Sequence, residues 1–285
     1  MTDAIKDLLE SLLKNAMVSF DTMANNACDK LQNGLSDSLW DTVSHLTGVF
    51  TPFCNIIIGI CILLELANIA SKVDLIKWEH GLKCGVKICL AKVCIEIAPT
   101  FLKACYNQCV LFIGAMGLSS GTVSLSGTVT PQISTALDEV DSLGGAIGLL
   151  CSTLILIMGI KICGLLVMIM TYGRIFEILV YLMVSPIPVA FACYNEGHDG
   201  IARITMKFIK GFIAVCLSGV MMYMCICIFG TIVNTVFTTL VTESVGASTG
   251  SALVSDLCYD MILFTIVLVM AVAKCGGWAK QIMDA

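Results

Sequence analysis

The amino-acid sequence predicts an all-α, polytopic membrane protein. Of its 285 residues, 58% are hydrophobic and 13% are charged, and the mean hydropathy is +0.93. Within residues 143–195 the only charges are Lys161, Arg174 and Glu177, although about 20 consecutive apolar residues already span a bilayer. A composition this apolar is typical of membrane proteins and not of soluble helix bundles. We therefore expect most of the chain to lie in a membrane.

Residues 1–50 form a predicted N-terminal region of two amphipathic helices. One face of the first helix collects apolar residues at helical spacing, Ile5, Leu8, Leu9, Leu12, Leu13 and Ala16. A second, weaker pattern is broken by Gly34 and contains Leu31, Leu35, Leu39, Val43 and Leu46. Both apolar stripes are too narrow for a helix that spans a bilayer. The helices are expected either to lie on the membrane surface or to pack on partner subunits.

Residues 51–285 form the predicted transmembrane domain, with about five spanning helices. The apolar runs place these spans at about 52–70, 93–118, 143–165, 208–230 and 257–274. Glu65 lies near one end of the first span, and Pro99 predicts a kink in the second. The residues just before the second span alternate lysine with apolar side chains, which indicates a helix at the interface whose lysines reach the head groups.

The distribution of basic residues predicts the orientation of the chain. Loops 119–142 and 231–256 contain no lysine or arginine, whereas 72–103 contains six lysines. Because cytoplasmic loops are enriched in basic residues, the two basic-free loops are expected outside the cell. The cluster of Arg203, Lys207 and Lys210 is expected inside, as is the C-terminus. The N-terminal region has seven acidic residues against three lysines, so we expect it outside.

This orientation constrains the apolar block 143–194. The chain is outside before it and inside after it, so it must cross an odd number of times. Three crossings would leave each span at the lower length limit, so one crossing is predicted, at 143–165, with Lys161 reaching the cytoplasmic interface. The remaining 166–194 is then a re-entrant or interfacial element. A competing model has six spans and breaks the charge rule at one loop.

Two features of this re-entrant or interfacial element stand out. Arg174 and Glu177 are spaced so that they can pair on one helical face. Pro186 and Pro188 must interrupt a helix, and a turn inside a membrane is stable only where protein covers its backbone. Charged residues in spans are functional candidates by default, so Glu65, Lys161, Arg174 and Glu177 are singled out.

The sequence contains no catalytic constellation. The sixteen cysteines include no CxxC pair and no cluster with zinc spacing, so we interpret them as small buried hydrophobic side chains. His198, which lies beside Glu196 and Asp199, is interpreted as part of a solvated loop. We therefore predict a protein that is not an enzyme and binds neither a metal nor a cofactor.

The central block also carries a family resemblance. A long apolar segment ends in Ser185, Pro186, Ile187, Pro188, Val189, Ala190 and Phe191. A short polar loop and a basic amphipathic stretch from Arg203 to Lys210 follow. In this motif, and in its layout over roughly 45–280, the chain resembles the TrbL-like family, the polytopic subunits of type IV secretion and conjugation machines. An extended polar periplasmic domain, found in some members, is replaced by the loop 119–142.

The resemblance implies a structural subunit of an inner-membrane translocation channel that passes DNA or protein. It implies a homo-oligomeric ring, with a pentamer favoured, in contact with other secretion-machine subunits, ATPases and membrane lipid, including a possible structural phospholipid. The channel or assembly candidates are Glu65, Lys161, Arg174, Glu177, Pro186, Pro188, Arg203, Lys207 and Lys210. The alternative is a small-solute or ion transporter in which the charged residues of the spans line a path. An internal repeat would favour that alternative, and none is evident in the sequence.

The predicted topology can be tested with single cysteines in a cysteine-less background. We expect Ser251→Cys to react with a membrane-impermeant maleimide added outside the cell, because loop 231–256 carries no basic residue. Labelling at this position from the cytoplasm alone would contradict the five-span model.

Overall fold

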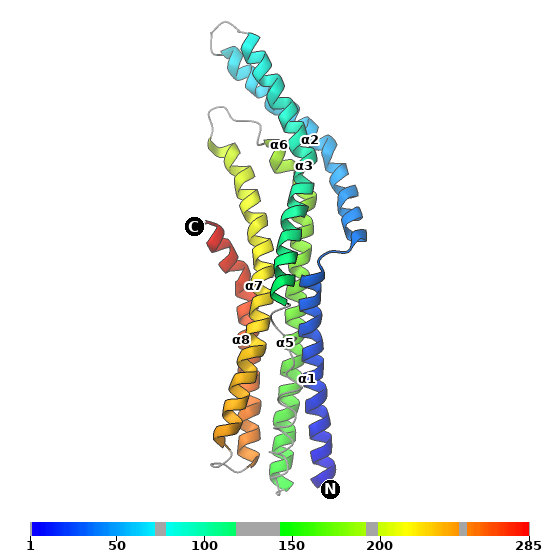
Figure 1. Cartoon of the computed structure of the whole chain (residues 1–285), viewed down its shortest axis with the longest axis vertical. Helices are drawn as coiled ribbons and strands as arrows, with labels where there is room; N and C mark the ends of the chain where they lie inside the picture. Colours follow the sequence, from blue (N-terminus) through cyan, green and yellow to red (C-terminus); the bar gives the residue numbers. More distant parts are fainter. Residues whose placement is uncertain (1, 72–77, 118–142, 192–198, 245–249, 285) are drawn as a thin grey trace. The chain divides into compact units, whose positions relative to one another are not determined.

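The described part of the computed structural model consists of α-helices and short connections, with no strand among its residues (Figure 1). It comprises residues 2–71, 78–117, 143–191, 199–244 and 250–284. The helices are α1 (Thr2–Asn33), α2 (Asp37–Ser71), α3 (Trp78–Gly117), α5 (Leu143–Val184), α6 (Pro186–Phe191), α7 (Asp199–Ser244) and α8 (Gly250–Asp284). The predicted all-α class is confirmed.

Four stretches of these helices are long and apolar enough to cross a membrane. They are Asp37–Leu64, Leu150–Phe191, Ile204–Val233 and Tyr259–Met283, which agrees with a polytopic membrane protein. The predicted span 93–118 is not among them, because Lys103, Asn107 and Gln108 dilute the apolar residues of α3. The crossing by α3 that the five-span topology needs therefore remains a prediction.

The apolar block 143–184 is one uninterrupted helix of 42 residues. At 1.5 Å per residue, α5 is about 63 Å long, twice the thickness of a hydrocarbon layer of about 30 Å. No turn occurs at residue 165, where we expected the crossing to end. Because a continuous helix crosses a bilayer only once, α5 leaves no turn for a second crossing. The re-entrant or interfacial placement of its C-terminal half stays a prediction.

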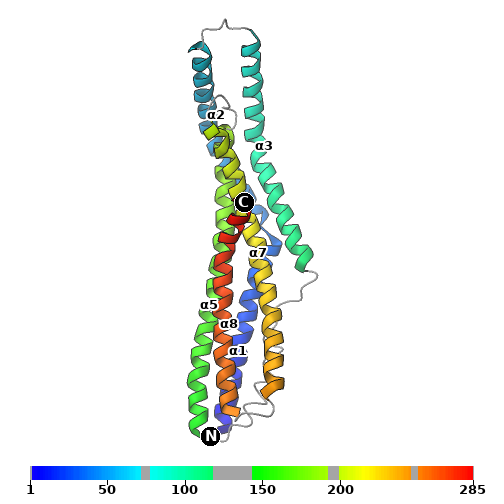
Figure 2. The ribbon, with the colours of Figure 1, turned by 90° about the vertical axis from the view of Figure 1, so that its left-hand side faces the viewer.

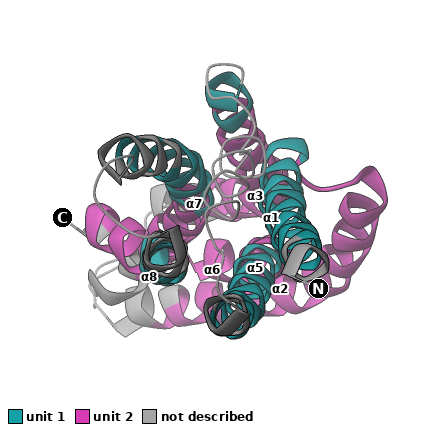
Figure 3. Cartoon of the chain, turned by 90° about the horizontal axis from the view of Figure 1, so that it is seen from below, with its two compact units in different colours: residues 1–33, 113–173, 219–276 teal, residues 34–112, 174–218, 277–285 magenta. Residues whose placement is uncertain are grey.

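The chain divides into two compact units (Figure 3). Unit 1 comprises residues 1–33, 113–173 and 219–276, and unit 2 comprises residues 34–112, 174–218 and 277–285. The long helices α3, α5, α7 and α8 each contribute residues to both units.

In unit 1 the apolar face of α1 is buried against the chain's own helices. Its buried residues repeat every three or four positions: Leu9, Leu13, Ala16, Met17, Phe20, Ala24, Ala27 and Leu31. The Phe20 ring lies 5.9 Å from that of Phe229 on α7, and Met23 lies against Gly164 on α5. This face was expected to contact lipid head groups or a partner subunit. Instead, side chains from distant parts of the same sequence cover it.

The second predicted amphipathic helix is the beginning of α2 and not a separate element. Gly34 ends α1 with a positive φ of 66°, which glycine adopts without steric cost, so the predicted break is confirmed. Asp37 then begins α2, where an acidic side chain interacts favourably with the helix dipole. The helix continues through Pro52 to Ser71. The boundary at residue 50 between an N-terminal region and a transmembrane domain therefore has no counterpart in the helices.

Unit 2 contains two clusters of buried apolar side chains. The first joins α2, α3, α5 and α7 through Trp40, Val43, Leu102, Tyr106, Ile178, Leu182, Phe212, Val215 and Cys216. The second joins α2, α3 and α6 through Cys54, Ile57, Ile58, Cys61, Ala91, Ile95 and Ala190. The short helix α6 is thus held on the apolar faces of α2 and α3.

Within unit 1, four helix ends lie together. The first residues of α1, α5 and α8 and the last residues of α7 are at the lower end in both Figure 1 and Figure 2. The basic-residue pattern places the N-terminus and the region between α7 and α8 on the same side of the membrane. The side of the membrane on which these ends lie stays a prediction.

Close packing at Gly117 makes a testable contribution to the stability of unit 1. A Cβ atom at Gly117 would lie 2.6 Å from the Tyr223 hydroxyl and 3.0 Å from Nε2 of Gln32, so we expect Gly117→Ala to destabilise the protein by about 1–3 kcal/mol. The matched control is Gly114→Ala, because nothing lies within 4 Å of the Cβ added there. Thermal unfolding in detergent measures both variants.

Adding Tyr223→Phe to Gly117→Ala removes the nearest clashing atom and should recover part of the lost stability. Equal unfolding temperatures for Gly117→Ala and Gly114→Ala would contradict this account of the packing.

Candidate functional site

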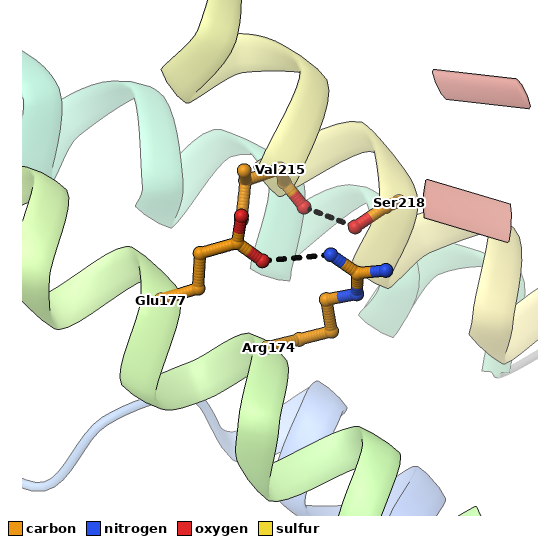
Figure 4. Close-up of polar contacts among 4 residues, drawn as sticks. All are labelled: Arg174, Glu177, Val215 and Ser218. Atoms are coloured by element: carbon orange, nitrogen blue, oxygen red, sulfur yellow. Dashed lines mark hydrogen bonds and ion pairs between the residues drawn. The ribbon is translucent and has the colours of Figure 1, made fainter. Parts of the chain in front are cut away.

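The charged pair predicted in the apolar block is formed. Nη1 of Arg174 donates to Oε2 of Glu177 over 2.7 Å, and their side chains are 23% and 33% exposed (Figure 4). Both residues lie on one face of α5, three positions apart, where side chains of a helix meet. Each charge offsets the other, so this part of α5 carries no net charge.

The ion pair lies beside an apolar contact between α5 and α7. Ile178, the neighbour of Glu177, packs in the same buried cluster as Val215 of α7. Ser218 of α7 is buried, and its hydroxyl donates to the carbonyl of Val215 over 2.7 Å (Figure 4). The polar groups here bind within their own helices, so none of them replaces a lost partner of the ion pair. Removing Arg174 or Glu177 therefore leaves the other charge unpaired in a partly buried position, which is costly.

Tyr181 links the charged region of α5 to the beginning of α7. It lies one turn beyond Glu177, and its ring is 5.3 Å from that of Phe208 and 6.2 Å from that of Phe212. Its hydroxyl would be only 3.1 Å from a Cβ atom at Gly211, so the absence of a side chain there admits the ring. Sequence reasoning missed Tyr181. Its position one turn after Glu177 indicates that it lies on the same helical face as the ion pair. The sequence does not show which residues of α7 it contacts.

The two prolines end α5 and begin α6. The backbone N–H of Ser185 donates to Leu182 over 3.3 Å, and its hydroxyl donates to the same carbonyl over 2.8 Å. Pro186 is the first residue of α6 and Pro188 the third, and the N–H groups of a first turn have no helical partner in any case. Both prolines therefore interrupt the chain at little cost.

The turn at the prolines is covered by protein. Pro186, Pro188 and Ala190 are buried, and the hydroxyl of Thr205 on α7 donates to the carbonyl of Pro188 over 2.6 Å. The structure thus meets the condition that irregular backbone at membrane depth must meet, namely satisfied polar groups and a protein cover.

The other candidate residues lie on α2, α5 and α7. Lys161 is exposed on the part of α5 that belongs to unit 1. Lys207 and Lys210 are exposed on α7. The backbones of Glu65 and Arg203 lie in α2 and α7, and their side chains are outside the described part of the structure. The predicted loop position of His198 is also outside it.

The cysteine side chains that the structure describes form no disulfide, and several of them lie close to other thiols. Sγ of Cys225 on α7 lies 3.6 Å from Sγ of Cys275 on α8, and Cys109 of α3 packs against the buried cluster that contains Cys216 of α7. On α1, burial and the proximity of Cys227 and Asp29 raise the pKa of Cys28 to about 12, so this residue stays a weakly nucleophilic thiol at neutral pH.

Among the side chains that the structure describes, no three histidine, cysteine or acidic groups are placed to hold a metal ion. The polar groups described here are a carboxylate and a guanidinium paired within α5, together with hydroxyls that donate to backbone carbonyls. The Thr205 hydroxyl joins α7 to the Pro188 carbonyl of α6 and so stabilises the turn at the prolines.

Comparison with known proteins identifies a family. Residues 20–186 match the model of a family described as TrbL/VirB6 plasmid conjugal transfer like protein. No curated protein and no solved structure matches the chain. The matched residues run from α1 to the first residue of α6 and cover more than half of the chain, whereas the basic stretch 203–210 lies beyond them. The chain is therefore a member of the TrbL/VirB6 plasmid conjugal transfer-like family.

Proposed function

We propose that this protein is a non-enzymatic subunit of a conjugal transfer machine and forms part of the path by which DNA or protein crosses the cytoplasmic membrane. In this proposal several copies assemble as a ring, other subunits and ATPases supply contacts and energy, and lipid surrounds the assembly. Membership of the TrbL/VirB6-like family supports the role in conjugal transfer.

The length of the apolar helix α5 is the observation that carries the proposal of an assembly. The helix is about 63 Å long, and large apolar side chains are exposed along it, among them Ile155, Met158, Leu165, Ile169 and Phe176. A bilayer covers about 30 Å of such a helix. With the predicted crossing at 143–165, Ile169 and Phe176 lie beyond the hydrocarbon layer. Exposed apolar surface there is stable when another protein surface covers it.

In this proposal, contacts near the turn at Pro186 and Pro188 hold the helices of each subunit together. Tyr181 packs the end of α5 against Phe208 of α7, and the bond from Thr205 to Pro188 holds the short helix α6 to α7. The alternative of a small-solute or ion transporter needs the charged residues of the spans to line one path, namely Glu65, Lys161, Arg174 and Glu177. The structure instead pairs Arg174 with Glu177, so nothing in this region favours that alternative.

The ion pair offers a test of function. We expect Arg174→Ala to lower conjugative transfer by about tenfold or more, because Glu177 is left unpaired at a partly buried position. Reversing the pair, with Arg174→Glu and Glu177→Arg together, should restore part of the transfer. Transfer frequency is measured from donors that carry each variant, beside the amount of protein in their membranes.

The matched control is Lys280→Ala, which removes an exposed cation from α8 and should leave transfer unchanged. Normal transfer from a donor that lacks the chain altogether would overturn the proposed role in conjugation.

Assembly is tested by mass measurement in native nanodiscs and in mild detergents. We expect a homo-oligomer, and we expect Phe176→Glu to weaken it, because this exposed side chain lies where a partner surface must cover α5. A monomer under every mild condition would contradict the ring.

A further inference from the structure

Helix α7 carries two thiols that meet thiols of other helices. Cys216 and Cys225 are nine residues apart, which is about two and a half turns of an α-helix, so they lie on opposite faces of α7. In unit 2, Cys216 belongs to the buried cluster against which Cys109 of α3 packs. In unit 1, Cys225 meets Cys275 of α8, 50 positions later in the chain.

The geometry of the second pair is that of a dithiol ready to be oxidised. The two Sγ atoms are 3.6 Å apart, and a shift of about 1.5 Å would bring them to the length of a disulfide bond. Cys275 is fully buried, and its thiol donates to the carbonyl of Ala271 over 3.2 Å. Cys225 is only partly buried. A reagent therefore reaches Cys225 first, with Cys275 held behind it.

We propose that Cys225 and Cys275 form a redox-active pair that a two-electron oxidant soluble in the apolar interior converts to a disulfide. Quinones and azodicarboxamides are oxidants of this class. Two S–H bonds break and one S–S bond forms, and both electrons and both protons pass to the oxidant, which becomes a hydroquinone or a hydrazine. A dithiol reductant reverses the reaction by thiol–disulfide exchange.

The consequence of oxidation is a covalent link between the last two helices of the chain. Cys225 and Cys275 lie in the candidate spans Ile204–Val233 and Tyr259–Met283, so the disulfide fixes the distance between two membrane helices that are otherwise held by packing. The site does not depend on the role proposed for the protein in conjugation, since it follows from unit 1 alone.

The test uses the unmodified protein in detergent or in membranes, with diamide as the azodicarboxamide oxidant. After oxidation, the remaining thiols are alkylated, and the digested protein is analysed by mass spectrometry. We expect most molecules to yield the Cys225 peptide joined to the Cys275 peptide, with the loss of two hydrogen atoms, and dithiothreitol to separate them. The oxidised protein should also unfold at a higher temperature, because the link constrains the unfolded chain.

The chain provides matched controls for this experiment. Cys225→Ser and Cys275→Ser should each abolish the joined peptide, while the other cysteines are retained. Cys151 and Cys163 also belong to unit 1, but they are twelve residues apart on α5, about 18 Å along the helix axis, and should not be linked. Failure to obtain the joined peptide, or equal linkage of Cys151 to Cys163, would overturn the proposal.

Discussion

The thickness of a bilayer is the constraint on which the rest of this structure depends. A hydrocarbon layer of about 30 Å accommodates about 20 helical residues, whereas α5, α7 and α8 have 42, 46 and 35 residues. Each of these helices must therefore extend beyond the layer, tilt within it, or be covered by protein. For α7 the cover is largely internal: 61% of its most apolar stretch is buried, compared with 28% for α2, 28% for α5 and 33% for α8.

The region from Arg174 to Thr205 shows how a chain can place polar groups in such surroundings. A full ion pair carries no net charge, two prolines occupy positions whose N–H groups have no partner in any helix, and a threonine hydroxyl binds the carbonyl of Pro188. Pairing of polar groups within the protein is the arrangement that the absence of water requires. Tyr181 then fastens this region to α7 through its aromatic neighbours.

Sequence reasoning succeeded where the physics is local. Composition predicted the membrane class, Gly34 predicted the end of α1, and the spacing of Arg174 and Glu177 predicted their ion pair. It failed where the answer depends on distant residues. Hydrophobic periodicity shows which face of α1 is apolar, but it does not show that side chains near Phe229 cover it.

Dependence on distant residues also explains two further differences between the sequence-based expectations and the structure. The first span was predicted to begin at about residue 52, yet α2 begins at Asp37 and continues through Pro52. A proline inside a membrane helix is tolerated when the freed backbone groups find other partners. The docking of α6 on α2 and α3 was also not predicted, since its contacts join residues near Cys54, Ile95 and Ala190, which are far apart in the sequence.

The length of α5 has a consequence for how the protein is made. The insertion machinery selects about 20 residues as a membrane segment and disfavours charged side chains at the centre of that segment. Within α5, residues 143–160 contain no charge, whereas Lys161, Arg174 and Glu177 leave no second uncharged segment of that length before the helix ends at Val184. During synthesis, these three charges disfavour any shift of the helix that would place them at the centre of the membrane. A helix long enough to insert in two registers is therefore expected to insert in a single register.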